Sequence, residues 1–320
     1  RNDIRLLGDT VRFGPSLVGA ARRVAAIARS ERVDVVCANS MKAFAYGSLG
    51  ARLAHRPLTW HLHDIPAAPY LSGDARVAFR MLVRVMRPAQ IVVASHAVAA
   101  ISPSPRTVVV PYGVHVGRRP QPRQRSATLR IGMAARLAGW KGQHVAVQAL
   151  ADLRQRLGID AELFLAGAAW FGEHAYENEV RALVRRLDLD DAVHLLGHVG
   201  DVEKFYESVD VAVHASTVPE PFGISVIQAL AAGRPVVGAN AGGTSELLEG
   251  CDGALLTPPG DTTALAGALA RFAADDAATV ERRSRAAWQR ARRYDARLEA
   301  VRLSRSYRLL VSEAPGRHRR

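Results

Sequence analysis

The chain has 320 residues, which is enough for about two domains of ordinary size. Hydrophobic residues make up 48% and charged residues 23%, which excludes bulk disorder, collagen-like repeats and a disulfide scaffold. The two cysteines, Cys37 and Cys251, lie far apart without a CxxC pair, which excludes a zinc ribbon and a redox dithiol. Since no apolar run reaches the ~18 residues of a membrane-spanning helix and no signal peptide is recognisable, we expect a soluble, cytoplasmic protein.

The net charge of +13 is unevenly distributed along the chain. Basic residues exceed acidic ones by 13 in residues 1–128 and by 9 in residues 280–320, whereas residues 129–279 carry 9 more acidic than basic residues. This division favours two domains with different partners, the basic one facing phospholipid or a phosphorylated acceptor. An Arg- and Ala-rich composition alone would also raise the pI. Nucleic acid is the least favoured partner, because no RNP-like aromatic motif, zinc finger or basic-region heptad is present.

Short β-branched runs alternate with longer helical patterns, which predicts βαβ units and parallel sheets. In the first half we expect helices near residues 16–30, 41–54 and 74–87, and strands at Val33–Cys37, Leu58–His61, Ile91–Ala94 and Val108–Val110. A doubly wound domain normally opens with a strand and a Gly-rich turn, whereas the first buried strand expected here begins only at Val33. We therefore expect the N-terminal domain to lack its first βαβ unit.

A segment rich in Pro, Gly, Arg and Gln, from Pro111 to Ser126, lies where the charge balance changes and is typical of a linker. After it, a strand is expected at Leu129–Met133. The later elements predicted are helices near 142–157, 173–187, 201–208, 223–232 and 243–249, and strands at Glu162–Leu165, Val193–Leu196, Val211–His214, Pro235–Val237 and Ala254–Leu256. Two or three helices end the chain. The fold class predicted is α/β, with two Rossmann-like domains in tandem.

The strongest chemical signal is the segment from Ser216 to Leu248. A glycine at position 223 allows close approach of a ligand, and the amides of Ile224 and Ser225 open a helix whose N-terminus can bind an anion. Glu220 lies before this helix and Gln228 about two turns along it. A second glycine turn, Gly242-Gly243-Thr244, opens another helix.

This segment resembles the E-x7-E region of retaining glycosyltransferases with the GT-B fold, specifically the large family numbered four. Gly132-Met133-Ala134-Ala135-Arg136 with Lys141-Gly142 resembles that family's G-R-…-K-G turn. Further segments in matching order are Phe164–Gly167, Leu195–His198, Tyr206 with Asp210-Val211, His61–Asp64 and Pro111–Val114. The resemblance implies two Rossmann-like domains around a cleft: an acceptor-side domain at 1–115, a linker at 116–128, a nucleotide-sugar-binding domain at 129–290, and a terminal helix at 291–320 that returns toward the first domain with a basic tail.

The resemblance also implies roles for individual residues. Arg136 and Lys141 would hold the diphosphate, because fixed cations stabilise the charge of a departing diphosphate. Glu220 would meet hydroxyls of the donor sugar, and His63 would reach that sugar from the first domain. The remaining donor-binding residues would be Gly197, His198 and Val199 at the base, with Phe222, Gly223, Ile224, Ser225 and Gln228. Family members retain the anomeric configuration and need neither metal nor cofactor, so we expect none here.

Three departures from the family pattern affect this expectation. The second glutamate, which grips the ribose hydroxyls, is Gln228, and an amide offers fewer strong acceptor sites than a carboxylate. Tyr112 and His115 replace the usual Asn and Asp of the P-N-G-V-D segment. The third departure is the missing opening unit, which carries a glycine loop beside the diphosphate.

Several other interpretations compete with these assignments. His63 is also compatible with a core or capping histidine, while metal ligation by His61, His63 and Asp64 is disfavoured on an alternating strand. Asp188-Leu189-Asp190 spells D-x-D but lies in a solvated turn. A basic amphipathic helix at 76–87 could contact the inner face of a membrane or simply form a solvated face. The rival functions are a non-catalytic GT-B partner and a sugar-nucleotide epimerase; a dehydrogenase is disfavoured because no G-x-G-x-x-G follows a first strand.

Overall fold

The computed structural model describes residues 14–67, 70–102, 104–121, 127–170 and 172–312. By their contacts these residues fall into two compact units. The first unit comprises the described residues up to Pro111 together with those from Glu299 onward, and the second unit comprises Tyr112–Leu298. The described residues 116–121 and 127–128 of the segment interpreted as a linker, and residues 291–298, thus group with the second unit. Residues 122–126 of that segment lie outside the described residues.

The first unit is built on a four-stranded parallel sheet in the order β1-β2-β3-β4. Its strands are β1 (Val36–Ala38), β2 (Leu58–Leu62), β3 (Gln90–Val93) and β4 (Thr107–Val109), and its helices are α2 (Gly14–Ser30), α3 (Met41–Ala54), α4 (Gly73–Met86), α5 (His96–Ile101) and most of α13 (Ala296–Ser312). Trp60 on β2 is buried and stacks on Phe44 at 4.1 Å between ring centroids. This aromatic pair joins α3 to the sheet.

The second unit contains a six-stranded parallel sheet in the order β10-β9-β8-β5-β6-β7. Its strands are β5 (Leu129–Ala134), β6 (Ala161–Ala166), β7 (Val193–Gly197), β8 (Val211–His214), β9 (Val236–Ala239) and β10 (Ala254–Thr257). In chain order within the unit, this is the 3-2-1-4-5-6 arrangement of a Rossmann fold. The predicted α/β class with Rossmann-like domains is therefore confirmed.

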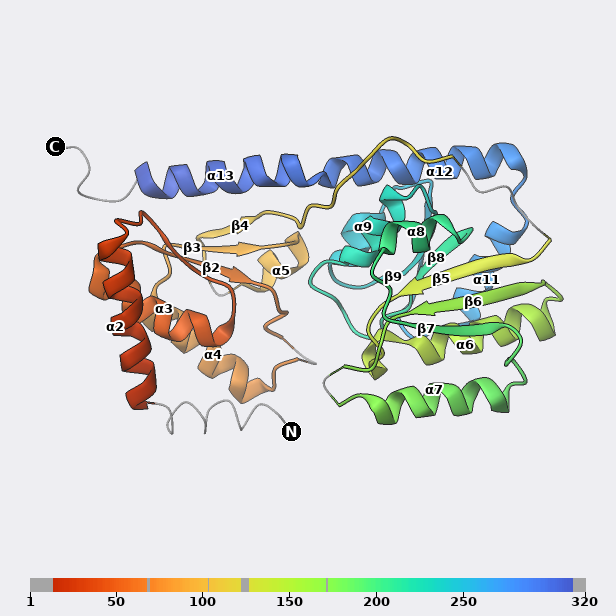
Figure 1. The fold of residues 1–320 in the computed structure, drawn as a ribbon, viewed down its shortest axis with the longest axis horizontal. Helices are drawn as coiled ribbons and strands as arrows, with labels where there is room; N and C mark the ends of the chain where they lie inside the picture. Colours follow the sequence, from red (N-terminus) through yellow and green to blue (C-terminus); the bar gives the residue numbers. More distant parts are fainter. Residues whose placement is uncertain (1–13, 68–69, 103, 122–126, 171, 313–320) are drawn as a thin grey trace. The chain divides into compact units, whose positions relative to one another are not determined.

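Helices cover both faces of this second sheet (Figure 1). They are η1 (Gly139–Lys141), α6 (Gln143–Ala151), η2 (Asp152–Arg156), α7 (His174–Arg186), α8 (Val202–Glu207), α9 (Ile224–Ala231), α10 (Gly243–Leu248), α11 (Thr262–Ala273), α12 (Ala277–Ala291) and η3 (Arg292–Tyr294). Aspartates cap three of these helices, since the side chains of Asp201, Asp261 and Asp276 accept first-turn N–H groups. The core between α6, α7, α11 and the sheet is almost entirely aliphatic.

Some predicted elements differ from those observed. The helix expected over 142–157 is α-helical only to Ala151 and continues as the π-helical η2. A π-helical turn has i→i+5 hydrogen bonds, and the apolar pattern of the sequence does not distinguish it from an α-helical turn. The strand expected at Val33–Cys37 begins at Val36. Helix α5 was not predicted, because its six residues, HAVAAI, are too few to show a helical period, although Ser95 caps it.

Candidate donor-binding site in the second unit

The strand order of the second sheet reverses beside β5. This strand pairs with β6 on one side and with β8 on the other. In open parallel sheets, ligands bind outside the carboxyl ends of the strands at such a switch point. The segments that leave β5 and β8 at this edge carry Lys141 and Glu220, so topology alone directs attention to these two residues.

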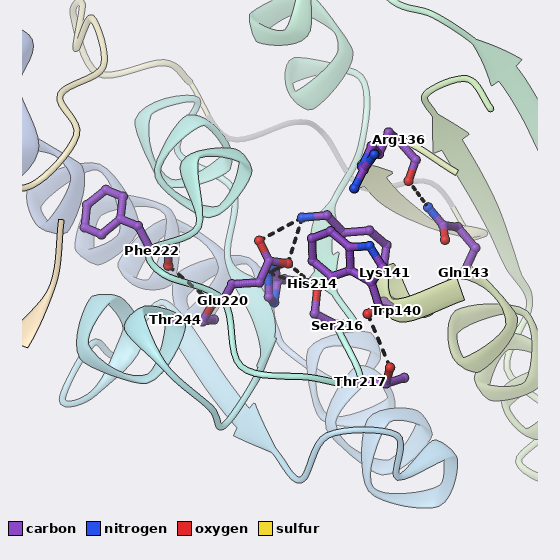
Figure 2. A network of polar contacts seen from close by, with 10 residues as sticks. All are labelled: Arg136, Trp140, Lys141, Gln143, His214, Ser216, Thr217, Glu220, Phe222 and Thr244. Carbon is purple, nitrogen blue, oxygen red and sulfur yellow. Dashed lines mark hydrogen bonds and ion pairs between the residues drawn. The ribbon is translucent and has the colours of Figure 1, made fainter. Parts of the chain in front are cut away.

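Lys141 and Glu220 form a close ion pair within a larger polar network (Figure 2). The Nζ of Lys141 donates to both carboxylate oxygens of Glu220, at 2.8 Å to Oε1 and 2.7 Å to Oε2. Oε1 also accepts from Nε2 of His214 at 2.9 Å and from the hydroxyl of Ser216. The side chains of Lys141 and Glu220 are only 16% and 9% exposed. The network is therefore a built feature of the fold rather than a surface contact.

The network fixes the charge of Glu220. Burial would raise the pKa of this carboxyl, but the charge and hydrogen bond of His214, and then those of Lys141, outweigh burial and hold the pKa well below its usual range. Among the described residues, Oε1 accepts from three partners and Oε2 from Lys141 alone. Oε2 is therefore the carboxylate oxygen that can accept a further hydrogen bond.

Two cations border the ring of Trp140. The Nζ of Lys141 lies 4.3 Å from the ring centroid and the guanidinium carbon of Arg136 lies 5.4 Å from it. The amide of Thr217 donates to the Trp140 carbonyl at 2.9 Å, and the Gln143 side chain donates to the Arg136 carbonyl at 2.9 Å. The loop after β5 is thus tied at both ends, and Arg136 and Lys141 lie on one aromatic ring.

Glycines allow the loops of this edge to meet backbone to backbone. Gly142 has φ +77°, and a Cβ there would lie 2.0 Å from the carbonyl oxygen of Ala215. Gly242 has φ +60°, and a Cβ there would lie 2.3 Å from the carbonyl oxygen of Glu220. No other residue fits at either position without moving the neighbouring loop. The glycines therefore set the spacing between Lys141, Glu220 and the turn that opens α10.

The predicted residues around α9 have different environments. Gly223, at φ +119°, precedes the helix, and Ile224 is 47% exposed at its first position. The Ser225 side chain hydrogen-bonds the hydroxyl of Tyr206, whose pKa is raised by burial. Gln228 is half-buried one turn further along. By contrast, Phe222 is only 3% exposed and packs edge-on against Tyr112 and Tyr294, which makes its side chain part of the core.

Gly197, His198 and Val199 follow β7. The carbonyl of Gly197 accepts from the amide of Gly167 at 2.7 Å, which ties the ends of β6 and β7 together. His198 is exposed and its ring lies 5.4 Å from that of Trp170, while Val199 is half-buried. These residues border the same carboxyl edge of the sheet, two strands away from β5.

His63 lies in the first unit, directly after β2, and is exposed. Burial lowers its pKa, with an opposing effect from Asp64. Its neighbour His61 bonds through Nε2 to the hydroxyl of Tyr307 at 2.6 Å. Among the described residues, no group of three or more His, Cys, Asp or Glu side chains is arranged to hold a metal ion.

Sequence reasoning missed four side chains of this site: His214, Ser216, Trp140 and Tyr176. A histidine that ends the buried strand VAVH was a usable signal, since a buried polar group needs a partner. Tyr176 gave no local signal. Its hydroxyl accepts from the amide of His144 at 3.2 Å and contacts Nδ1 of that residue at 2.9 Å. It thereby caps α6, for which Gly142 offers no side chain.

Comparison with known proteins links this geometry to one family. Residues 118–293 match the family described as Glycosyl transferases group 1. A segment of 97 residues is 38% identical to the glycogen synthase of Mycobacterium tuberculosis; it covers 30% of this chain but only 23% of the synthase.

Two solved structures illustrate the likeness in fold. The Anabaena HepE protein, in complex with UDP, superposes with a TM-score of 0.80 at 27% identity, over 90% of this chain and 82% of HepE. HepE has also been solved with UDP-glucose. A glycosyltransferase from Rickettsia africae superposes with a TM-score of 0.80 at 21% identity, over 93% of this chain and 82% of its own, and so bears on the fold alone.

Proposed function

Because the chain belongs to the glycosyl transferases group 1 family, we propose that it transfers a sugar from a nucleotide-diphosphate sugar to an acceptor with retention of anomeric configuration. The observation that carries this proposal is the Lys141–Glu220 pair at the switch point of the second sheet, with Arg136 on the same aromatic ring. The retaining family numbered four is proposed from the resemblance of its E-x7-E and G-R-…-K-G segments to those of this chain. A UDP-sugar is the proposed donor, since HepE was solved with UDP and with UDP-glucose.

In the proposed mechanism, Arg136 and Lys141 hold the diphosphate and neutralise the charge that develops as the bond between the anomeric carbon and the phosphate oxygen breaks. The acceptor oxygen attacks the same face of the sugar, and its proton passes to the departing phosphate. Since fixed cations perform the task of a metal, we propose that the reaction needs none. The amides of Ile224 and Ser225 add to the anion site.

Glu220 has two tasks in this proposal. It orients Lys141 through both oxygens, and the spare acceptor site on Oε2 takes a hydroxyl of the donor sugar. We also propose, from the resemblance, that His63 contacts the sugar. Gly197, His198 and Val199 line the base, Gly223 allows close approach of the diphosphate, and Gln228 meets the ribose. Phe222, with its buried side chain, supports this loop from the core.

We propose that the acceptor is anionic or membrane-borne. Residues 1–128 carry an excess of 13 basic residues over acidic ones, and long-range attraction of this kind raises the local concentration of an anionic substrate. A donor-binding protein without turnover is the second candidate, and the observation in its favour is Gln228 in place of a glutamate.

Isothermal titration of the chain with UDP, GDP and ADP, with EDTA or magnesium present, tests the donor site. We expect UDP to bind equally well in both buffers and Arg136→Ala to weaken it about tenfold or more, as for a lost charged hydrogen bond. Arg185→Ala, on the exposed face of α7, is the matched control and should change nothing. Binding of no nucleotide, or binding only with magnesium, would refute the proposed site. Release of UDP from UDP-glucose then separates an enzyme from a non-catalytic partner.

A further inference from the structure

Helix α4 of the first unit exposes an unusual combination of side chains. Its inner face packs into the core through Phe79 and Val83, which are buried. Its outer face carries three large apolar side chains that remain mostly in solvent: Val77 is 59% exposed, Met81 58% and Val85 60%. Since these residues recur every fourth position, they form one stripe along the helix.

A second stripe runs beside the first. Arg76, Arg80 and Arg84 also recur every fourth position, and Arg87 follows at the C-cap. All four arginines are exposed, and none forms an ion pair with another residue in the part of the chain that the structure describes. The one acidic residue of the helix, Asp74, lies in its first turn. The outer face of α4 is thus half cationic and half apolar.

Exposure to water accounts for the arginine stripe, because charged side chains are well solvated, but it does not account for the apolar stripe. A purely solvated face would carry no row of exposed Val and Met side chains, and a nucleic acid would contact the arginines without covering the apolar row. An anionic bilayer satisfies both stripes at once, because its phosphates pair with arginine while its acyl boundary accepts apolar side chains. We propose that α4 is a membrane-docking helix that lies in the headgroup region of anionic phospholipid, with Val77, Met81 and Val85 inserted.

Residues of α3 next to α4 add to its cationic and apolar surface. The guanidinium of Arg52 on α3 donates to the Val85 carbonyl, which ties the end of α3 to that of α4 and places a further cation there. Next to it, Leu53 is also exposed. No described helix is long and apolar enough to cross a bilayer, so contact through a helix face is the form of attachment that α4 supports.

Vesicle flotation of the purified chain tests the inference. One set of vesicles contains phosphatidylcholine alone and the other an equal mixture of phosphatidylcholine and phosphatidylglycerol. We expect flotation only with the mixed vesicles, weakened by added salt because screening shortens the reach of the arginines. Equal flotation with both vesicles, or with neither, would overturn the proposal. So would tight binding to a mixed-sequence DNA duplex without binding to vesicles.

Variants of α4 show whether this helix is the docking face. Arg80→Gln with Arg84→Gln should lower partitioning on the order of tenfold or more, at about fivefold per arginine near an anionic surface. The pair Arg185→Gln with Arg186→Gln on α7 removes the same charge from the second unit and should have little effect. Met81→Ser should reduce flotation even at low salt. Leu157→Ser, which changes an apolar side chain 47% exposed at the end of η2 in the second unit, should not. Equal losses in the α4 and α7 variants would show non-specific charge attraction and overturn the assignment.

This inference does not rest on the donor chemistry. Titration with UDP on the same preparations distinguishes the two proposals, because a protein that binds UDP but no vesicle refutes only the docking role of α4. Retained UDP affinity in the α4 variants shows that their second unit is folded, and an unchanged circular dichroism spectrum and thermal unfolding curve show that their first unit is folded as well.

Discussion

The two units build the carboxyl edges of their sheets in different ways. In the second unit, Lys141, Glu220, His214 and Ser216 are bonded to one another and the loops around them touch backbone to backbone at Gly142. The bonds among these side chains fix the shape of this edge, and such preorganisation would lower the cost of binding the diphosphate proposed for it.

The corresponding edge of the first unit is held more loosely. His61 lies on β2, the strand that pairs with β1. Among the described residues its side chain has one hydrogen-bond partner, the hydroxyl of Tyr307 on α13, at 2.6 Å from Nε2. The Sγ of Cys37 contacts the same hydroxyl at 3.6 Å. Burial lowers the pKa of His61, with a smaller effect from His63, and so favours the neutral ring. One unit therefore resembles a finished site, whereas the other offers adaptable polar groups. Substitutions at the carboxyl edges of the two sheets should therefore differ in their effect on the free energy of unfolding.

The largest effect is expected from Gly142→Ala. The new Cβ would collide with the Ala215 carbonyl oxygen, and φ is positive, so we expect a loss of about 4 kcal/mol in the free energy of unfolding together with loss of UDP binding. Gly158→Ala is the matched control, since φ there is +64° but nothing lies within 4 Å of the added atom. Strain alone should cost the control about 1 kcal/mol. Equal losses in urea denaturation would show that the close approach to Ala215 is unimportant.

Glu220→Gln should have the next largest effect. It leaves Lys141 buried without its anion, and we expect a loss of about 3 kcal/mol at neutral pH. Because the pKa of Glu220 is depressed in the folded state, its contribution is present above the unfolded value near 4.5 and is lost as the pH falls toward the folded value. The difference between the two proteins should therefore shrink on acidification below about pH 4.5.

Urea denaturation across a pH series measures this difference. Glu177→Gln, which removes an exposed pair with Arg181 on α7, is the control and should cost under about 0.5 kcal/mol. A Glu220→Gln difference that stays constant between neutral and acid pH would contradict the depressed pKa.

These predictions use contacts that the sequence alone could not supply. Alternating β-branched runs indicated the Rossmann-like fold, and strand Val211–His214 was placed correctly because its first three residues form an apolar run. The pairing of Lys141 with Glu220 was not foreseen, since 79 positions separate them and only the β5–β8 neighbourhood brings them together. The sequence therefore indicated the residues but not their bond.

The sequence did not predict the environment of a side chain where that environment depends on packing against distant residues. Phe222 was expected to line the donor site, but nothing in E-P-F-G distinguishes a ring that faces a ligand from one that packs on Tyr112 and Tyr294. Tyr176 was overlooked because the residues that it contacts lie far from it in the sequence. It caps α6 from α7, and a cap supplied by a distant helix leaves no local motif.

The smallest effect is expected in the first unit, from Tyr307→Phe. The substitution removes the hydroxyl that bonds Nε2 of His61 and contacts Cys37, and keeps the ring that packs beside β1 and β2. We expect a loss of about 1 kcal/mol, the ordinary value of one partly buried hydrogen bond. UDP affinity should not change, because the partners of this hydroxyl among the described residues, His61 and Cys37, are not proposed to hold the donor.

Tyr46→Phe is the matched control. Tyr46 is half-buried and its hydroxyl has no hydrogen-bond partner among the described residues, so stability should change little. If few hydrogen bonds hold the carboxyl edge of the first sheet, loss of the Tyr307 hydroxyl should have only a local effect. Amide hydrogen exchange in Tyr307→Phe should then rise only near the ends of β1 and β2. A loss of about 3 kcal/mol with exchange rising throughout the unit would instead show that His61 and Tyr307 hold this edge as firmly as Lys141 and Glu220 hold the other. The contrast between the two units would then disappear.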